Sequence, residues 1–231
     1  MNGDIDFYAL PDEMLSHVAS FLVHDDQACC MFARVCRRFH GVAHDVFDQG
    51  PTFKHACRQG YIEIVQLLLT DGHVDPTAEN NCAIRWSSEK GHADVVRLLL
   101  VDTRVDPTAI NNAATHWSCA YGHIGVVELL LADGRVDPTA NYNWAIQQSS
   151  ANGHADVVKL LLADGRTDPT AYDNCTIRWS SANGHADVVK LLLADGRTDP
   201  TAFDNEAIEK SSKRGHADVV RLLLAATTMR S

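Results

Sequence analysis

One pattern of apolar and polar residues recurs through most of the chain. In its fullest form it spans residues 91–100 and reads Gly-His-Ala-Asp-Val-Val-Arg-Leu-Leu-Leu. Close copies begin at Gly153, Gly184 and Gly215, and looser copies begin at Gly60 and Gly122. Neighbouring copies start 31 residues apart. A fixed period of this length is typical of stacked supersecondary units, each of which needs its neighbours to bury its apolar face. The pattern therefore predicts an elongated array of six units.

Each unit is expected to begin with a short helix, as the copy from Cys82 to Asn112 illustrates. Ala83 to Lys90 should form this first helix, and Asn81 should be its N-cap, because an Asn side chain accepts an unpaired backbone N–H. Gly91 should end the helix, since glycine adopts the left-handed C′ conformation at least cost. Asparagine recurs at the N-cap position as Asn112, Asn143, Asn174 and Asn205.

The second helix of the unit should begin near Asp94 and be mostly buried. Its valines and leucines are too numerous for a helix that exposes one broad face to water. Residues 101–112 then contain Asp106-Pro107, which predicts an extended loop or finger, because proline cannot continue a helix. The Gly-Pro pair at residues 50–51 predicts a turn before the first unit.

The first 45 residues follow a different pattern. Apolar residues at positions 14, 15, 18, 21 and 22 form a helical stripe, and Pro11 suits the first turn of that helix. Residues 28–43 form a second apolar and basic stretch. Two or three helices of this size bury only a small core, so we expect this segment to pack against a partner protein or against the repeats.

Composition narrows the classes of partner. The 231 residues carry a formal net charge of −10, which argues against nucleic acid or a membrane surface as the main partner. We find no secretory signal and no apolar run of roughly 20 residues that could span a bilayer. The seven cysteines suggest no disulfide framework. We therefore expect a cytoplasmic protein, with the nucleus as a second location, that is a monomer outside any complex.

The repeat resembles the ankyrin repeat. Residues 82–92, Cys-Ala-Ile-Arg-Trp-Ser-Ser-Glu-Lys-Gly-His, stand where that family has Thr-Pro-Leu-His-x-Ala-Ala-x-x-Gly-His. The resemblance implies an all-α ankyrin-repeat solenoid over residues 51–231, with six helix-turn-helix units and short finger loops. The 31-residue variety is similar to repeats in proteins of giant amoeba-infecting DNA viruses and of amoebae. The units should start at about Pro51, Cys82, Ala113, Trp144, Cys175 and Glu206.

Residues 1–45 resemble a small helical F-box-like domain. The resemblance rests on Leu-Pro-Asp-Glu-Met-Leu from Leu10 and on Val-Cys-Arg-Arg-Phe from Val35. It implies that this segment binds the Skp-type adaptor of a cullin–RING ubiquitin ligase. The residues implied in adaptor binding and in packing of the motif are Leu10, Pro11, Met14, Leu15, Val18, Leu22, Val35 and Phe39. The alternative is that these helices only cap the first repeat.

Positions that change from unit to unit predict where a target protein binds. One such column lies on the first helix, which faces the concave groove in the ankyrin family: His55, Trp86, Trp117, Gln148, Trp179 and Lys210. Tryptophan is enriched among residues that dominate binding energy. A second column precedes the asparagines and consists of Glu79, Ile110, Asn141, Tyr172 and Phe203. Tyr172 and Phe203 with Trp179 indicate a binding end in units four to six. The alternative is that the indoles pack between adjacent units.

The sequence offers no constellation for catalysis. Five histidines belong to Gly-His turns, and Cys36 with His40 has no second pair of metal ligands. We find no phosphate-binding glycine loop and no nucleophile–base pair. We therefore expect a non-enzymatic protein without metal or cofactor. The favoured function is a substrate-recruiting adaptor of a ubiquitin ligase. The alternatives are a stand-alone ankyrin protein that masks a host factor, and a repeat expansion with little selected binding.

Overall fold

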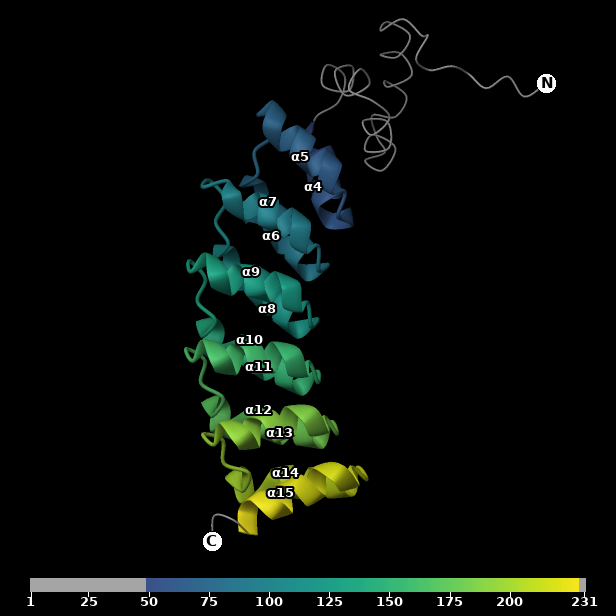
Figure 1. The fold of residues 1–231 in the computed structure, drawn as a ribbon, viewed down its shortest axis with the longest axis vertical. Helices are drawn as coiled ribbons and strands as arrows, with labels where there is room; N and C mark the ends of the chain where they lie inside the picture. The colour runs from purple at the N-terminus through teal and green to yellow at the C-terminus, as the bar shows by residue number, and fades with distance from the viewer. Residues whose placement is uncertain (1–48, 229–231) are drawn as a thin grey trace, which may run out of the picture.

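The computed structural model describes residues 49–228, which form twelve helices and no strand. The helices come in six pairs stacked in one elongated column (Figure 1). The first helices are α4 (Gln49–Gln59), α6 (Ala78–Glu89), α8 (Ala109–Ala120), α10 (Ala140–Ala151), α12 (Ala171–Ala182) and α14 (Ala202–Lys213). The second helices are α5 (Ile62–Asp71), α7 (Ala93–Val101), α9 (Ile124–Asp133), α11 (Ala155–Asp164), α13 (Ala186–Asp195) and α15 (Ala217–Thr228). The predicted all-α solenoid is confirmed, while the F-box-like segment of residues 1–45 lies outside the described residues.

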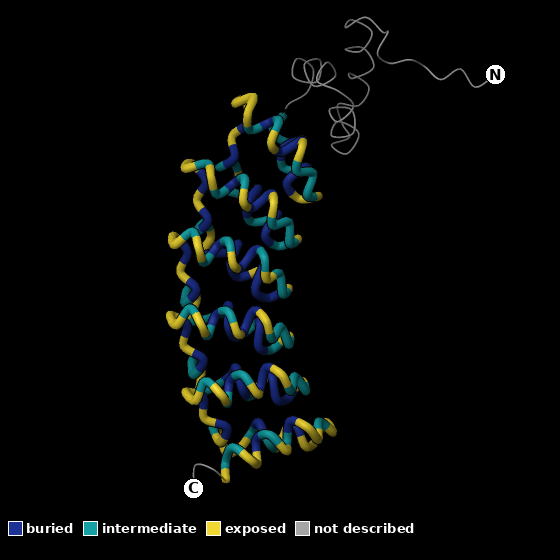
Figure 2. Tube along the Cα trace, viewed as in Figure 1, coloured by how far each residue is buried: buried dark blue, intermediate teal, exposed yellow. Residues whose placement is uncertain are grey.

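Apolar burial joins the units. Ile84 in α6 and Val95 and Leu99 in α7 are at most 1% exposed. One cluster of buried side chains runs from Phe53 in the first unit to Val136 in the third. Two further clusters also span more than one unit each. Figure 2 shows the buried segments facing one another between adjoining pairs. No unit therefore encloses its own leucines, as the repeat period predicts.

Glycine ends the first helix of each pair, as predicted. Gly91 has φ +78°, its N–H donates to the carbonyl of Ser88 at 3.2 Å, and the N–H of His92 donates to that of Ser87 at 2.9 Å. These bonds satisfy the carbonyls that the end of a helix leaves unpaired. The next residue, Ala93, begins α7, so the two helices turn back on each other within a few residues.

The predicted role of the recurring asparagine is wrong. Asn81 does not cap the following helix, because it is the last of three residues in the left-handed conformation. Glu79, Asn80 and Asn81 have φ of 52°, 55° and 58°. The same left-handed turn recurs at 110–112, 141–143, 172–174 and 203–205. In the second unit this turn lies at the end of residues 101–112, for which the sequence predicts an extended loop or finger.

The asparagine instead ties its unit to the next one. Asn81 Oδ1 accepts the backbone N–H of Asp106 at 2.8 Å. Asp106 Oδ1 in turn accepts the N–H of Thr108 at 2.8 Å and its hydroxyl at 2.6 Å, which closes the Asp-Pro-Thr turn. The tie between units recurs from Asn112 to Asp137, from Asn143 to Asp168 and from Asn174 to Asp199.

The histidine of the Gly-His turn makes a second tie. His92 Nε2 lies 2.9 Å from the carbonyl of Arg58, and because a carbonyl only accepts, Nε2 carries the hydrogen. The ring also lies against the glycine of the preceding unit, where a Cβ on Gly60 would come within 2.6 Å of His92 Nδ1. Equivalent bonds join His123 to Glu89, His154 to Ala120 and His185 to Ala151. These histidines are structural, as predicted.

The start of the stack differs from the prediction. The helix α4 begins at Gln49, so Gly50 and Pro51 lie in its first turn and do not form a separate turn. Proline is tolerated there, because the first N–H groups of a helix have no hydrogen-bond partner within the helix. The fixed φ of proline also suits a helical backbone.

Gly153→Ala should destabilise the stack more than Gly215→Ala. Both glycines have positive φ, +81° and +80°, so either substitution costs about 1–2 kcal/mol from the left-handed backbone. Only at Gly153 does the new Cβ also come within 2.5 Å of a ring atom of the next unit, Nδ1 of His185. Moving that ring would break its bond to Ala151 and add about 1 kcal/mol.

Urea unfolding followed by far-UV circular dichroism measures the two losses. A larger drop in the unfolding midpoint for Gly153→Ala is the expected result. Equal drops would contradict a role for the glycine–histidine contact.

Candidate functional site

The first-helix column predicted from the sequence faces outward only in part. Trp117 is 42% exposed and Trp179 is 38% exposed, and Lys210 is exposed as well. Three other members, His55, Trp86 and Gln148, are half-buried. All six belong to first helices, so the column follows one side of the stack.

The indoles combine the two arrangements that the sequence left open. The Trp117 ring stacks near Tyr121, with centroids 6.1 Å apart and an interplanar angle of 22°. It also meets the Trp144 ring of the next unit edge to face, with centroids 5.6 Å apart and an interplanar angle of 77°. The Trp86 ring lies 5.8 Å from the guanidinium of Arg58 in the preceding unit. Trp86 and Trp117 therefore pack against a neighbouring unit, and Trp117 and Trp179 still expose over a third of their surface.

The second predicted column lies on the left-handed turns. Ile110, Tyr172 and Phe203 occupy the first position of their turns and are 53%, 59% and 61% exposed. Glu79 and Asn141 take the same position in their units and are also exposed. The turns thus present these side chains to solvent near the start of α6, α8, α10, α12 and α14.

Sequence reasoning missed several aromatic side chains of this surface. Tyr142 is 71% exposed at the second position of its turn, and Tyr121 is 52% exposed at the end of α8. Each is the single aromatic residue in a column that is otherwise polar. An aromatic residue in an otherwise polar column could therefore have marked both positions in the sequence. The contact of Trp144 with Trp117 was not visible in the sequence, because it depends on how two units pack.

Contacts between units connect several of these aromatic side chains. The rings of Tyr142 and Tyr172 meet edge to face at 5.8 Å. His116 packs against the next unit, since its ring lies 5.1 Å from that of Trp144 and its Nε2 lies 3.3 Å from the carbonyl of Ala140, just before the next turn. Burial lowers the pKa of His116, which keeps the ring neutral at pH 7. We call this surface the aromatic face; it consists of Ile110, Trp117, Tyr121, Tyr142, Tyr172, Trp179 and Phe203.

A cluster of charged side chains lies at the C-terminal end of the aromatic face. The guanidinium of Arg178 lies 4.1 Å from the ring centroid of Phe203. Glu206 forms ion pairs with both Arg178 and Lys210. Hydrogen bonds from Arg178 and then from Lys210 lower the pKa of Glu206 below its ordinary value. Lys210, predicted as a target-binding residue, is therefore engaged within the stack.

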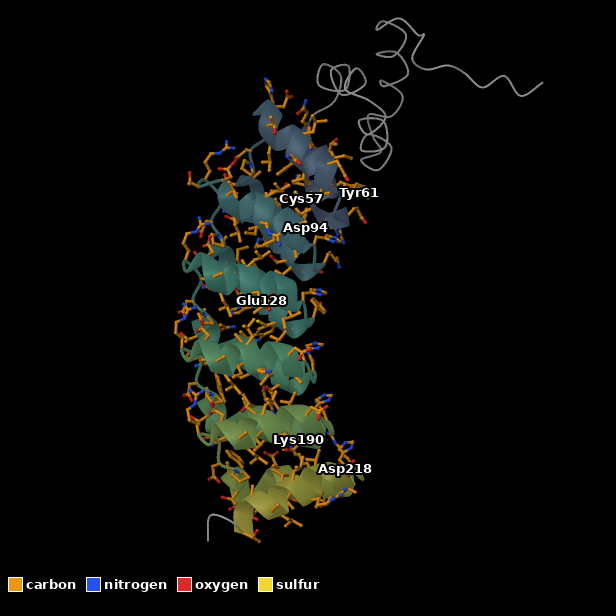
Figure 3. All side chains as sticks on the ribbon, in the orientation of Figure 1. Cys57, Tyr61, Asp94, Glu128, Lys190 and Asp218 are labelled. Atoms are coloured by element: carbon orange, nitrogen blue, oxygen red, sulfur yellow. The ribbon has the colours of Figure 1, made fainter. Side chains whose placement is uncertain are left out.

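The opposite side of the stack has a different character. Figure 3 places Asp94, Glu128, Lys190 and Asp218 along the second helices. Many of these charges pair along their helix, such as Arg97 with Asp94 at 2.9 Å and Lys190 with Asp187 at 3.1 Å. A shallow hollow of about 350 Å³ lies between α13 and α15 and is bordered by Lys190 and Asp218. Exposed ion pairs of this kind stay solvated and contribute little to the stability of the fold.

Within residues 49–228, no group of three or more His, Cys, Asp or Glu side chains is placed to hold a metal ion. The four cysteines of that range are buried, and burial raises the pKa of the Cys119 thiol to about 12. None of the twelve helices that the structure describes is long and apolar enough to cross a membrane.

Comparison with known families identifies the repeat. A family model described as ankyrin repeats in three copies matches residues 28–111, 53–142 and 144–230. The chain belongs to the ankyrin repeat family. A model described as F-box-like matches residues 7–47, so the N-terminal resemblance is also confirmed. None of the curated proteins matches the chain.

A solved ankyrin structure shares the fold. The crystal structure of the ankyrin repeat domain of Bcl-3, described as a unique member of the IkappaB protein family, matches with a TM-score of 0.62 and 24% sequence identity. The match covers 75% of this chain and 85% of the Bcl-3 domain. At this identity the likeness shows a common ankyrin fold and nothing of the partner.

Glu206→Gln should weaken the contact between the last two ankyrin units. At pH 7 it removes a carboxylate that accepts hydrogen bonds from Arg178 and Lys210, at a cost of about 1.5 kcal/mol. Because the folded-state pKa of Glu206 is lowered, the wild-type advantage is fully present above the unfolded-state pKa of about 4.3 and disappears as pH falls through the folded-state pKa.

Glu209→Gln is the matched control, because Glu209 lies on the same helix and pairs with Lys213 at an exposed site. Thermal unfolding from pH 7 to pH 2 should show a large, pH-dependent difference for Glu206→Gln and almost none for Glu209→Gln. A constant difference across that range would contradict the ion-pair role.

Proposed function

We propose that this chain is a non-catalytic adaptor that recruits a target protein to a cullin–RING ubiquitin ligase. Its F-box-like segment binds the Skp-type adaptor, and its ankyrin stack binds the target. The observation that carries the proposal is the tandem of two families: the F-box-like match ends at residue 47 and the first helix of the stack begins at Gln49.

The short junction between the F-box-like segment and the ankyrin stack has a physical consequence. A target bound to the stack is held close to whatever the F-box-like segment binds, which raises its effective concentration at the ligase. The chemistry of ubiquitin transfer belongs to the partner enzymes, so the adaptor itself needs neither a catalytic group nor a cofactor. Such a protein acts in the cytoplasm or nucleus, and it is a monomer outside the complex.

The two binding surfaces use different residues. Adaptor binding rests on the eight F-box-like positions from Leu10 to Phe39, which lie outside the described residues. Target binding rests on the aromatic face, whose exposed rings are the residue types that dominate interface energy.

The alternative function is a stand-alone ankyrin protein that masks a host factor, with the N-terminal helices acting only as a cap. Both functions use the aromatic face. They differ in whether the first 45 residues bind a ligase adaptor, so the experiment that separates them measures adaptor binding.

Leu15→Asp with Leu22→Asp should abolish adaptor binding. Two charges on the apolar stripe of the predicted helix would be buried in the interface without partners, which costs several kcal/mol, or roughly a thousandfold in affinity. Co-purification of the full chain with a Skp-type adaptor, followed by isothermal titration, measures the loss.

The control is Ser16→Asp with Ser20→Asp, which places the same charges on the same helix but outside the apolar stripe at positions 14, 15, 18, 21 and 22. The control should bind as the wild type does. Failure of the wild-type chain to bind the adaptor would leave the masking function in its place.

A further inference from the structure

Three tryptophans occupy the same position of their units but differ in what surrounds them. Trp86, Trp117 and Trp179 each hold the fifth position of a unit, in units two, three and five. Trp86 is half-buried, whereas Trp117 and Trp179 are 42% and 38% exposed. The three sites therefore form a comparison within one chain, in which the backbone position is constant and the neighbouring side chains change.

The stack covers two of its aromatic rings with arginine. The guanidinium of Arg58 lies 5.8 Å from the ring centroid of Trp86, and that of Arg178 lies 4.1 Å from the ring centroid of Phe203. A cation over the face of an aromatic ring is attracted by the quadrupole of its π system. Within the part of the chain that the structure describes, the two exposed tryptophans of the column have no such cation.

The residue that stands in the place of Arg58 makes the Trp117 site distinct. Arg58 lies 28 positions before Trp86, and the same spacing puts Glu89 before Trp117. Where the first unit supplies a cation to the indole, the second unit therefore supplies a carboxylate. Glu89 pairs with Lys90 at 2.9 Å, and both side chains are partly exposed. A pair of this kind contributes little stability, so a guanidinium can take the place of the ammonium.

A second ring enlarges the exposed aromatic surface at Trp117. Tyr121 is 52% exposed, and its ring lies 6.1 Å from that of Trp117 at an interplanar angle of 22°. Two rings so close to parallel form one platform on α8. The Trp144 ring meets the indole edge to face and supports it from the next unit. The site thus combines an exposed aromatic platform with a carboxylate from the preceding unit.

A guanidinium suits this combination better than an ammonium does. The planar guanidinium stacks on a ring while its N–H groups donate to a carboxylate, whereas an ammonium is a strongly hydrated point charge. The stack itself uses arginine for both of the rings that it covers. A chain of net charge −10 also attracts a positively charged segment.

We infer that Trp117, Tyr121 and Glu89 bind an arginine side chain from a basic segment of the target protein. The guanidinium stacks on the two exposed rings and donates hydrogen bonds to the Glu89 carboxylate. The target thereby makes in unit three the kind of contact that Arg58 makes with Trp86 inside the stack. The inference rests on the proposed function, since it names the chemistry of the partner that the ankyrin stack takes.

Two substitutions give this site the surroundings of Trp179. At the corresponding positions around Trp179 stand Ala151, 28 residues before it, and Asn183, four residues after it. Glu89→Ala with Tyr121→Asn therefore removes the carboxylate and the second ring, and it uses residues that the stack already carries at these positions. This variant should unfold at the same temperature as the wild type.

A phage-displayed library of random 12-residue peptides tests the inference. The library is first depleted on Glu89→Ala with Tyr121→Asn and then selected on the wild-type full chain. The enriched peptides should have a positive net charge and share an arginine. Enrichment of peptides without arginine, or of nothing above background, would overturn the inference.

Isothermal titration of a synthetic enriched peptide then examines the arginine itself. Citrulline in place of the shared arginine keeps its shape without its charge and should weaken binding by about tenfold or more. Lysine in its place should also weaken binding, because an ammonium does not stack as a guanidinium does. Equal affinity for the arginine and citrulline peptides, or for the arginine and lysine peptides, would overturn the inference.

The protein variants locate the contact. Glu89→Ala with Tyr121→Asn should bind the arginine peptide about tenfold more weakly than the wild type does. Glu128→Ala is the control, because it removes one carboxylate from an exposed position of α9 on the opposite side of the stack (Figure 3). The control should bind as the wild type does. Equal losses in the two variants would reduce the effect to net charge and overturn the inference.

The same preparations separate this inference from the proposed function. Binding of the Skp-type adaptor is assigned to residues 7–47 and should be unchanged in Glu89→Ala with Tyr121→Asn. Loss of arginine-peptide binding with intact adaptor binding supports both proposals. Adaptor binding without any arginine-dependent peptide would overturn only the arginine site, and arginine-peptide binding without adaptor binding would overturn only the ligase role.

Discussion

The order of the stack depends on one hydrogen bond that a left-handed turn makes possible. Asn143 ends its turn with φ 66°, and from there its Oδ1 accepts the N–H of Asp168 in the next unit at 2.7 Å. Asp168 then holds Thr170 through its own carboxylate. Because each turn positions the following one, the leucine-bearing helices meet in a fixed register and can share their burial.

The same turn links stability to function. Its last residue, an asparagine, serves the fold, while its first two residues point outward and vary between units. Three αL residues in succession impose strain, and the chain accepts more of it than necessary by placing Ile110, Tyr142, Tyr172 and Phe203 there. The outcome is a scaffold with two unlike sides: the second helices carry charges that pair along the helix, and the first helices and turns carry exposed aromatic rings.

Sequence patterns within a single repeat predicted much of the fold. The helix pairs, the glycine ends and the buried leucines followed from patterns within 31 residues. The role of Asn81 did not, because its partner Asp106 lies 25 residues ahead in another unit. For the aromatic face, variation between the units identified Ile110, Trp117, Tyr172, Trp179 and Phe203, and it missed Tyr121 and Tyr142. It could not find the Trp117–Trp144 contact or decide how far each indole is buried, since both depend on packing between units.

The most direct test compares Asn143→Gly with Asn205→Gly by urea unfolding. Both residues have φ 66°, and glycine keeps that backbone while removing the side chain. Only Asn143 bonds to a following unit, and Asn205 makes no side-chain hydrogen bond within residues 49–228. Asn143→Gly should lower the free energy of unfolding by about 1–1.5 kcal/mol, and Asn205→Gly by a few tenths at most. Equal effects would contradict the claim that the turn sets the register of the stack.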